Sequence, residues 1–460
     1  MNMLWTKDEA VAATGGECAV GWRVSGVSID TRTLQKGDLF VALTDVRDGH
    51  DFVAQALEKG AAAALVSRVP DGVSAGAPLL VVNDVLQGLE ALGVAARARI
   101  SGKVIGVTGS VGKTGTKEML RCALAGQGRV HAAEKSYNNH WGVPLTLARM
   151  PRDTDFAVIE IGMNHAGEIG PLARMADLDV AVITIVAPVH LAAFSGVSEI
   201  AQAKAEIFEG LKRGGTAILN ADIETLPILR NGAEKAGAQI VTFGHSSLAD
   251  FRLMGAYISD TATKVIFDLA GQKVDYSIAA PGVHLAMNSL AVLAACDAIG
   301  ANLSVCITDL ANWSTPLGRG TRETVQLGNG QIELIDESYN ANPTSMAAAL
   351  NVLAATQPKG RKVAILGDML ELGETEHELH AELAMLEAVK SVDVFHLVGP
   401  IMHTFYAALP SDKRGQWVAS VDALSAEISD LLEAGDTVMI KGSLGSKVSK
   451  IVDVIRKISA

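Results

Sequence analysis

The chain has 460 residues, of which 49% are hydrophobic, 20% charged and 4% aromatic. A chain of this length is too long for one ordinary hydrophobic core, so roughly two to four domains are expected. The composition excludes long disordered stretches. The formal net charge of −12 argues against broad binding to nucleic acid or to anionic membranes, because both need a basic surface.

The start of the chain and its cysteines predict a cytoplasmic protein. The segment MNMLWTKDEA carries acidic residues where a secretory signal would be basic. No uncharged apolar run reaches about 18 residues, so we expect no membrane insertion. The four cysteines form no CxxC pair, which favours buried free thiols over a metal site or disulfides.

Residues 1–83 predict a small α/β domain. Between residues 24 and 82, short apolar strands surround one helix-like segment, namely VSGVSID, DLFVAL, DFVAQALEKG, AALV and PLLVV. The Ala/Leu-rich stretch from Asp84 to Ile100 has helical spacing and no strand signal. We therefore expect a helix there that carries the chain into the next domain.

Residues 84–314 predict a parallel-sheet domain, and residues 315–460 a second, Rossmann-like one. In the central range, the apolar runs KVIGV, FAVIEI, VAVITIV and TAILN alternate with helical segments, as in sheets covered on both faces. Between Phe251 and Ala280 the apolar residues alternate singly, which predicts antiparallel hairpins. The last range repeats the strand and helix alternation. The fold class is therefore α/β with three domains.

A strand, a glycine-rich turn and a helix follow one another in KVIGVTGSVGKTGTKEML. Gly109 and Gly112 allow backbone N–H groups to face phosphate oxygens, Lys113 supplies positive charge and the Thr114 hydroxyl can hold Mg²⁺. Compared with G-x-x-x-x-G-K-[ST], the first glycine is replaced by Val107. A purely structural turn is the alternative, and ATP or GTP binding is the interpretation we favour. The predicted phosphate-binding residues are Gly109, Ser110, Val111, Gly112, Lys113 and Thr114.

Two carboxylates end apolar strands. Glu160 ends FAVIEI, where a charge is costly unless it faces a cation at the carboxyl edge of the sheet. We interpret it as a metal ligand, and the alternative is an ion pair with a nearby lysine or arginine. Asp336 follows IELI in the same way, so we place it too at a ligand-binding edge.

The turn TGSVGKT resembles the nucleotide loop of the Mur ligases, whose pattern is TG, two variable residues and GKT. The segment KSYNNHWGVPLTL resembles that family's substrate-binding segment, and EIGMNHAGEI its metal-binding strand end. PVHLAAF and AKAEIF supply His190 and Lys204 at the family's spacing. Near the start, VSIDTRTLQKGDLFVAL and DGHDF resemble the family's uridine-diphosphate-binding domain. The resemblance thus covers nearly the whole chain.

Segments of the last third resemble the branch of the family that adds D-alanyl-D-alanine. They are DESYNANPTSM, LGDMLELGE and VMIKGS. DNPR, the signature of the branch that adds diaminopimelate or lysine, is absent, whereas YNANP is present. The resemblance implies a ligase that uses ATP to activate the carboxylate of UDP-N-acetylmuramoyl-tripeptide as an acyl phosphate and then joins it to D-alanyl-D-alanine. We expect the protein to be a monomer.

The resemblance also implies two Mg²⁺ ions, held by Thr114, Glu160, His190 and Lys204. A lone histidine is usually structural and Mg²⁺ prefers oxygen, so the residues alone would not select His190. Lys204 lies in AQAKAEIFEGL and would ordinarily be solvated. Carbamoylation by CO₂ would give Lys204 a negative charge, and that reaction requires a neutral amine with a lowered pKa.

The remaining residue roles also come from the resemblance. The predicted catalytic residues are Lys113, His190, Lys204 and Arg319. Further predicted contacts to ATP are Asn288, Arg319, Asp336, Tyr339 and Asn340. The predicted contacts to the nucleotide-linked substrate or the dipeptide are Ser28, Asp30, Thr31, Arg32, Asn138, Asn139, His140, Lys441 and Ser443. Turn formation, a capped turn or a helix-surface amide is the alternative for several of these polar residues.

Two other functions stay open at this point. A nucleotide-switch protein would use the GKT loop to gate a partner instead of powering synthesis. A Mur-type ligase could also take another amine, as the diaminopimelate- or lysine-adding and folylpolyglutamate enzymes do. The N-terminal segments argue against the folylpolyglutamate alternative.

Overall fold

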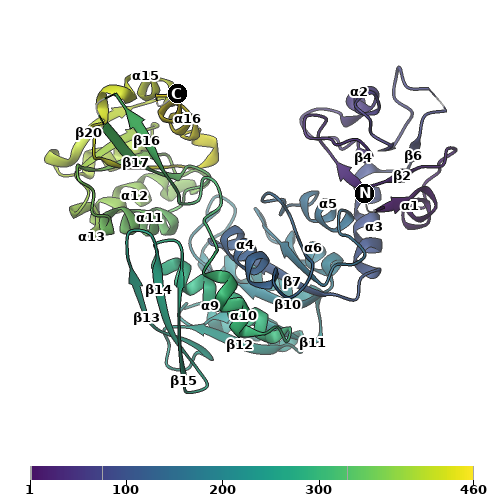
Figure 1. Cartoon of the computed structure of the whole chain (residues 1–460), viewed down its shortest axis with the longest axis horizontal. Helices are drawn as coiled ribbons and strands as arrows, with labels where there is room; N and C mark the ends of the chain where they lie inside the picture. Colours follow the sequence, from purple (N-terminus) through teal and green to yellow (C-terminus); the bar gives the residue numbers. More distant parts are fainter. Residues whose placement is uncertain (1–2, 75, 329, 459–460) are drawn as a thin grey trace.

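The computed structural model describes residues 3–74, 76–328 and 330–458, and all elements named below lie in these ranges. The chain forms three α/β parts, and the first and last lie at opposite ends of the central one (Figure 1). The predicted α/β class is confirmed, with a central sheet that is mainly parallel and carries antiparallel strands. The predicted boundaries stay a prediction and serve below as names for the first, central and last domains. No helix in the described ranges is both long and apolar enough to cross a bilayer.

The first domain is built on a parallel sheet of order β3-β4-β5-β6. Its elements are β1 (Trp5–Thr6), α1 (Lys7–Thr14), β2 (Arg23–Val24), β3 (Gly26–Ser28), β4 (Asp38–Val41), η1 (Gly49–Phe52), α2 (Val53–Glu58), β5 (Ala63–Val66) and β6 (Leu79–Val81). The sequence prediction missed α1 and the ribbon of β1 and β2. Helix α1 begins with a capping box, in which Thr6 and Glu9 satisfy each other's backbone N–H groups.

Helix α3 (Val85–Ala98) was predicted and connects the first domain to the central one. Its residues Leu89, Leu92 and Ala96 share a core with the first-domain strands and with Leu145 of the central domain. Near its end, the buried Arg97 donates to the carbonyl oxygen of Ala176 at 2.9 Å.

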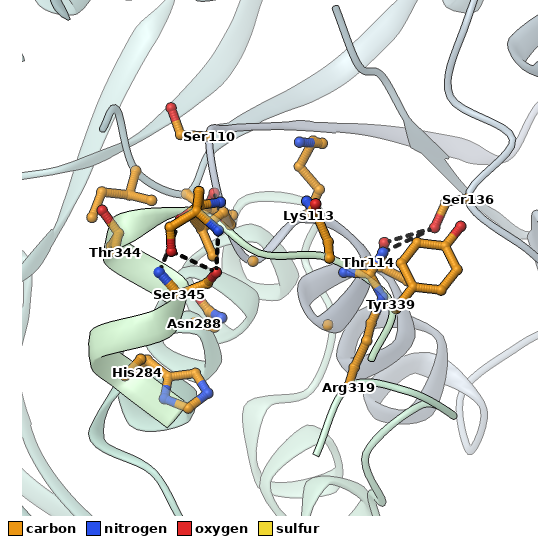
Figure 2. A pocket seen from close by; sticks show the side chains of 18 of the residues that line it. Ser110, Lys113, Thr114, Ser136, His284, Asn288, Arg319, Tyr339, Thr344 and Ser345 are labelled. Atoms are coloured by element: carbon orange, nitrogen blue, oxygen red, sulfur yellow. Dashed lines mark hydrogen bonds between the residues drawn. The ribbon is translucent and has the colours of Figure 1, made fainter. Parts of the chain in front are cut away.

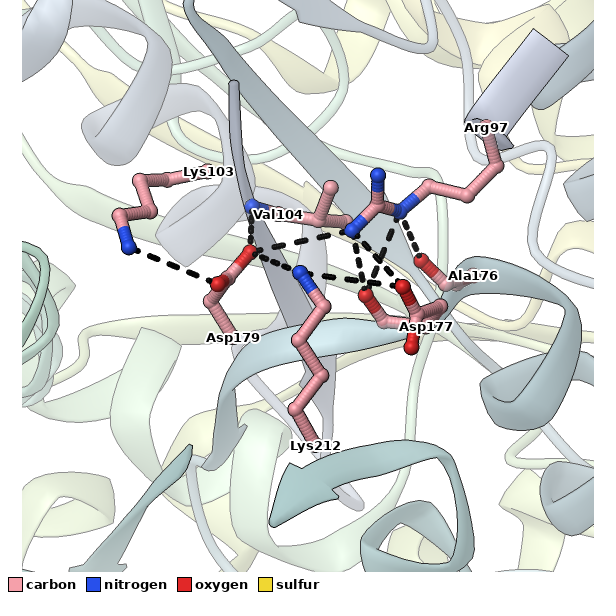
Figure 3. Close-up of polar contacts among 7 residues, drawn as sticks. All are labelled: Arg97, Lys103, Val104, Ala176, Asp177, Asp179 and Lys212. Atoms are coloured by element: carbon pink, nitrogen blue, oxygen red, sulfur yellow. Dashed lines mark hydrogen bonds and ion pairs between the residues drawn. The ribbon is translucent and has the colours of Figure 1, made fainter. Parts of the chain in front are cut away.

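The end of α3 is tied to the central domain by charged groups. Arg97 lies 3.0 Å from a carboxylate oxygen of Asp177, and Asp179 also accepts from Lys212 at 3.1 Å. Figure 3 shows Lys103, Lys212 and Arg97 converging on these two aspartates. The carboxyl-terminal end of α3 is therefore anchored to the central domain.

The central domain has a nine-stranded sheet of order β15-β14-β13-β12-β11-β10-β7-β9-β8, in which only the β13–β14 and β14–β15 pairs are antiparallel. Its strands are β7 (Lys103–Thr108), β8 (Val130–Ala132), β9 (Phe156–Glu160), β10 (Leu178–Ile183), β11 (Leu211–Asn220), β12 (Gln239–Gly244), β13 (Phe251–Ile258), β14 (Thr263–Leu269) and β15 (Gln272–Ile278). Its helices are α4 (Lys113–Leu124), α5 (Gly142–Ala148), α6 (Ile169–Ala176), α7 (Val197–Ala205), η2 (Glu206–Gly210), α8 (Leu226–Lys235), α9 (Val283–Ala298) and α10 (Leu303–Leu310). Helices α4, α9 and α10 pack on one face, and α5 to α8 on the other.

The strand register brings the predicted site to one edge of this sheet. Val107 of β7 pairs with Glu160 of β9 on one side and with Val182 of β10 on the other. The carboxyl ends of three parallel strands therefore meet where the chain enters the glycine turn. Gly112 has a φ of 88°, a backbone conformation that residues with side chains rarely adopt. This conformation allows α4 to begin directly after the turn.

The last domain has a six-stranded sheet of order β16-β17-β21-β18-β19-β20, with only the β16–β17 pair antiparallel. Its strands are β16 (Thr321–Leu327), β17 (Gly330–Glu337), β18 (Lys362–Gly367), β19 (Val394–Val398), β20 (Arg414–Val418) and β21 (Thr437–Lys441). Its helices are α11 (Pro343–Ala355), η3 (Gly373–Thr375), α12 (Glu376–Glu382), η4 (Leu383–Met385), α13 (Glu387–Lys390), α14 (Met402–Ala408), η5 (Ser411–Lys413), α15 (Val421–Leu431), η6 (Leu444–Ser446) and α16 (Ser449–Ile458). Helices cover both faces, as a doubly wound sheet requires.

Candidate functional site

A cavity of about 820 Å³ is lined by residues of both the central and the last domain. The glycine turn and the start of α4 form part of its wall, together with α9 and the loop between β17 and α11. Figure 2 shows Arg319, Tyr339, Ser136 and Thr114 grouped together, with His284, Asn288 and Ser345 at a distance from them in the view. The cavity thus combines cationic, hydroxyl and amide groups from distant parts of the chain.

The glycine turn has the geometry of a phosphate-binding loop. Residues Ser110 to Gly115 line the cavity, and the Nζ atom of Lys113 donates to the carbonyl oxygen of Gly109 at 2.7 Å. A Cβ atom on Gly112 would lie 2.9 Å from the amide nitrogen of Asn288, so a side chain has no room there. Burial lowers the pKa of Lys113, and the nearby Glu160 opposes this effect. The turn can therefore receive an anion, which would favour the charged form of Lys113.

Glu160 is a buried carboxylate with an unused oxygen. Its Oε1 atom accepts from the Thr114 hydroxyl at 3.1 Å and from the side-chain amide of Asn138 at 2.7 Å. Its Oε2 atom is buried without a hydrogen-bond partner in the described structure. The hydrogen-bonding groups around it are a hydroxyl and an amide, and not the lysine or arginine of the alternative interpretation. An orphaned buried oxygen beside a threonine hydroxyl fits a divalent cation.

Ser136 is a central residue of this site that the sequence prediction missed. Its hydroxyl lies 3.0 Å from that of Thr114 and accepts from Nη2 of Arg319 at 3.3 Å. The guanidinium of Arg319 also stacks over Tyr339, at 4.2 Å from the ring centroid. The fully buried Lys117 donates to the carbonyl oxygen of Ala133 at 2.6 Å and so fixes the segment that carries Ser136.

His190 lies in the loop after β10 and lines the cavity. Its Nδ1 atom is 2.7 Å from a carboxylate oxygen of Glu371, which belongs to the last domain and was not predicted. Burial lowers the pKa of His190, while the Glu371 charge raises it.

Lys204, on α7, is only 2% exposed, whereas the sequence alone suggested a solvated lysine. No hydrogen bond or ion pair joins its Nζ atom to any other residue that the structure describes. Burial, together with the charge of Lys113, lowers its pKa well below the usual lysine value. The residue therefore meets the requirement for a neutral, nucleophilic amine.

No ready-made metal cage is present in the described ranges. No three His, Cys, Asp or Glu side chains gather closely enough there to hold an ion. A divalent cation at Thr114 and Glu160 would thus need water, phosphate or a modified lysine to complete its shell, which is the usual situation for Mg²⁺.

Several predicted residues of the last domain form hydrogen bonds or ion pairs with other residues of that domain. The Asp336 carboxylate accepts from the Ser338 hydroxyl at 2.6 Å and from Arg456 at 3.2 Å, and Asp336 is not among the cavity-lining residues. Ser443 accepts from the backbone N–H of Leu370 at 2.9 Å. The buried Lys441 lines the cavity and pairs with Glu337 at 3.1 Å.

The predicted residues of the first domain lie outside the cavity. Arg32 donates to the Asp30 carboxylate at 2.6 Å, and this hydrogen bond is the main reason why the pKa of Asp30 is lowered. Ser28 hydrogen-bonds to the backbone of Asp30, as in the capped turn considered from the sequence. Asp48, of the DGHDF segment, caps η1 through the N–H of His50.

In the central domain, Asn138 and Asn139 line the cavity, whereas the exposed His140 does not. The side-chain oxygen of Asn139 accepts from the N–H of Gly142, the first residue of α5. Asn288 and Asn340 line the cavity as predicted residues, and His284, Glu337 and Glu371 line it without having been predicted. The only sequence signal for Glu371 was its place in LGDMLELGE.

Three family models together match most of the chain. They are the Mur ligase family catalytic domain at residues 23–100, the Mur ligase middle domain at 107–296 and the Mur ligase glutamate ligase domain at 322–444. The chain belongs to the Mur ligase family. The resemblance stated from the sequence is therefore confirmed.

Individual Mur ligases match over their full lengths. A UDP-N-acetylmuramoyl-tripeptide–D-alanyl-D-alanine ligase of Rickettsia prowazekii is 34% identical, with 98% of this chain and 99% of the relative covered. The crystal structure of MurF from Acinetobacter baumannii has a TM-score of 0.86 at 27% identity and covers 99% of each chain. MurF from Thermotoga maritima, solved in complex with ADP, has a TM-score of 0.77 at 25% identity, with 95% of this chain and 98% of that one covered.

Proposed function

We propose that this Mur ligase uses ATP to join D-alanyl-D-alanine to UDP-N-acetylmuramoyl-tripeptide, giving the pentapeptide precursor used in peptidoglycan synthesis. The observation that carries the proposal is the end-to-end match to a ligase named for that reaction, at 34% identity. The cavity between the central and last domains supports it, because phosphate-binding and cationic groups meet there. We also propose that the enzyme acts in the cytoplasm as a monomer.

The reaction brings two anions together. The substrate carboxylate and the γ-phosphate repel each other by roughly 4 kcal/mol per unit pair at about 4 Å and an effective dielectric near 20. In our proposal, Lys113 of the central domain and Arg319 of the last domain offset this repulsion from two walls of the cavity. The carboxylate attacks the γ-phosphorus and displaces ADP, and the dipeptide amine then attacks the acyl carbon and displaces phosphate.

We propose that Thr114 and Glu160 hold one Mg²⁺ and that His190 and a carbamoylated Lys204 hold a second. The orphaned Oε2 atom of Glu160 supports the first assignment, and the buried Lys204 amine supports the second. When bound, Mg²⁺ would supply Lewis-acid and template effects. The residues themselves orient the reacting groups and exclude water, which would otherwise hydrolyse the acyl phosphate.

The substrates would occupy three regions. Asn288 and Asn340 line the cavity and would contact ATP. Asp336 would contact ATP only if its hydrogen bonds to Ser338 and Arg456 break. Asn138 and Asn139 would meet the tripeptide end, and Lys441 the dipeptide. Ser28, Asp30, Thr31 and Arg32 would meet the uridine diphosphate in the first domain, with His140 and Ser443 in supporting positions.

An amine screen with purified protein, ATP and Mg²⁺ tests the proposal. Phosphate release should require both UDP-N-acetylmuramoyl-tripeptide and D-alanyl-D-alanine, and mass spectrometry should show the pentapeptide. Product formed with diaminopimelate or lysine on the dipeptide precursor would identify another Mur branch. Phosphate release that is indifferent to any amine would instead support a nucleotide switch.

A further inference from the structure

The contact between His190 and Glu371 joins two loops from different domains. His190 follows β10 of the central domain, and Glu371 follows β18 of the last domain. The Nδ1 atom of His190 is 2.7 Å from the Oε2 atom of Glu371. The two residues are 181 positions apart, so the contact exists only while the last domain lies against the central one.

This contact fixes the chemistry of the imidazole. An ionised carboxylate only accepts hydrogen bonds, so Nδ1 must carry the proton that it donates to Glu371. In the neutral ring, Nε2 then keeps its lone pair and is the nitrogen able to bind a cation. A carboxylate that holds the other ring nitrogen is the usual partner of a metal-binding histidine.

The backbone around the contact is held in unusual conformations on both sides. His190 has a φ of 54° and Glu371 a φ of 66°, both in the left-handed region that residues other than glycine rarely adopt. A Cβ atom on Gly373 would lie 3.2 Å from backbone atoms of Ala192, so the two loops approach with little space between them. Such conformations persist where surrounding contacts hold them, and they gather at functional sites.

We propose that Glu371 is a positioning residue that sets the His190 tautomer and completes the second cation site when the last domain closes on the central one. The inference rests on the proposed function, because that function assigns His190 to a cation. In this role Glu371 acts through His190 and needs no contact of its own with nucleotide or peptide. It makes cation binding at His190 depend on domain closure.

Binding of Mn²⁺ to the full-length protein tests the proposal without any turnover. Electron paramagnetic resonance would count bound Mn²⁺ in the presence of a non-hydrolysable ATP analogue and UDP-N-acetylmuramoyl-tripeptide. We expect two sites in the wild-type protein. Glu371→Ala should weaken one of the two sites by about 10-fold to 100-fold and leave the other unchanged. Glu374→Ala, which removes an exposed carboxylate three positions away, is the matched control and should bind as the wild type does.

A conservative variant separates positioning from direct ligation. The side-chain oxygen of Glu371→Gln can still accept from Nδ1, so this variant should keep most of the Mn²⁺ affinity. Equal losses in the Gln and Ala variants would overturn the positioning role, as would an unchanged isotherm for Glu371→Ala or a single Mn²⁺ in the wild type. Failure of the amine screen with two intact Mn²⁺ sites would reject the proposed substrates and leave the role of Glu371 standing.

Discussion

Arg319 of the last domain donates a hydrogen bond to Ser136 of the central domain, with 3.3 Å between Nη2 and Oγ. The Ser136 hydroxyl is 3.0 Å from that of Thr114, which donates to Glu160 at 3.1 Å. Because the single Thr114 proton goes to Glu160, Ser136 must donate to Thr114 and accept from Arg319. A chain of hydrogen bonds thus runs from a cation to an anion, and the hydrogen bonds within such a chain strengthen one another.

We predict that Ser136→Ala lowers kcat/KM for ATP about tenfold, because a hydrogen bond to a charged group contributes about 1.5 kcal/mol or more. Steady-state kinetics at saturating peptide substrates would measure it. The free energy of unfolding should change little, since the segment stays anchored by Lys117. Ser304→Ala, an exposed serine on α10, serves as the control. Wild-type kinetics in Ser136→Ala would show that the Arg319 contact has no part in the reaction.

Lys204→Met should raise stability and abolish ligase activity. A buried amine without a hydrogen-bond partner costs about 1–3 kcal/mol, and methionine fills similar space without that cost. The pKa of Lys204 lies well below the usual value, so the unfolded chain binds more protons between the two values. The stability of the wild type should therefore rise with pH across that window, and this rise should be missing in the variant.

Urea unfolding at several pH values measures this effect, and the amine screen measures activity. Lys235→Met replaces an exposed lysine on α8 and should change neither property. A Lys204→Met protein that is less stable than the wild type, or that retains ligase activity, would contradict the interpretation of Lys204 as a strained, functional amine.

Local patterns predicted the elements that bear the site, and long-range contacts escaped prediction. The glycine turn and the position of Glu160 follow from strand ends and glycine spacing within short segments. The Arg319–Ser136 contact joins residues 183 positions apart, and the periodicity of apolar residues cannot predict a contact between such distant positions. A carboxylate at the end of an apolar strand does not always face a ligand site: the carboxylate of Asp336 hydrogen-bonds to Ser338 and Arg456. Helix α1 was missed because its first-turn cap, and not an apolar stripe, marks it.

His396 should make the last domain acid-sensitive. It is 4% exposed on β19, its Nδ1 atom accepts from the backbone N–H of Gln416 at 3.1 Å, and burial lowers its pKa to about 4. Below its ordinary pKa of 6.5 the unfolded chain binds more protons, so stability falls as pH falls. By about pH 4 the loss should reach about 3 kcal/mol.

His396→Gln tests this prediction, because its amide oxygen accepts the same hydrogen bond and does not titrate. Urea unfolding followed by tryptophan fluorescence, to which Trp417 of the adjacent strand β20 contributes, would compare pH 7 with about pH 4.5. The stability lost between these values should be smaller in the variant than in the wild type. Equal losses in both proteins would assign the acid sensitivity to other groups.

Arg97→Met should destabilise the junction between α3 and the central domain. The substitution removes the donor to the Ala176 carbonyl oxygen at 2.9 Å and the ion pair with Asp177 at 3.0 Å. We expect a loss of about 2–3 kcal/mol in urea unfolding, below the usual range for a broken buried pair because the Asp177 side chain is 54% exposed. Lys103→Met removes an exposed partner of Asp179 at 3.6 Å and should cost at most about 0.5 kcal/mol. Equal costs for the two variants would mean that net charge, and not the buried guanidinium, holds the helix in place.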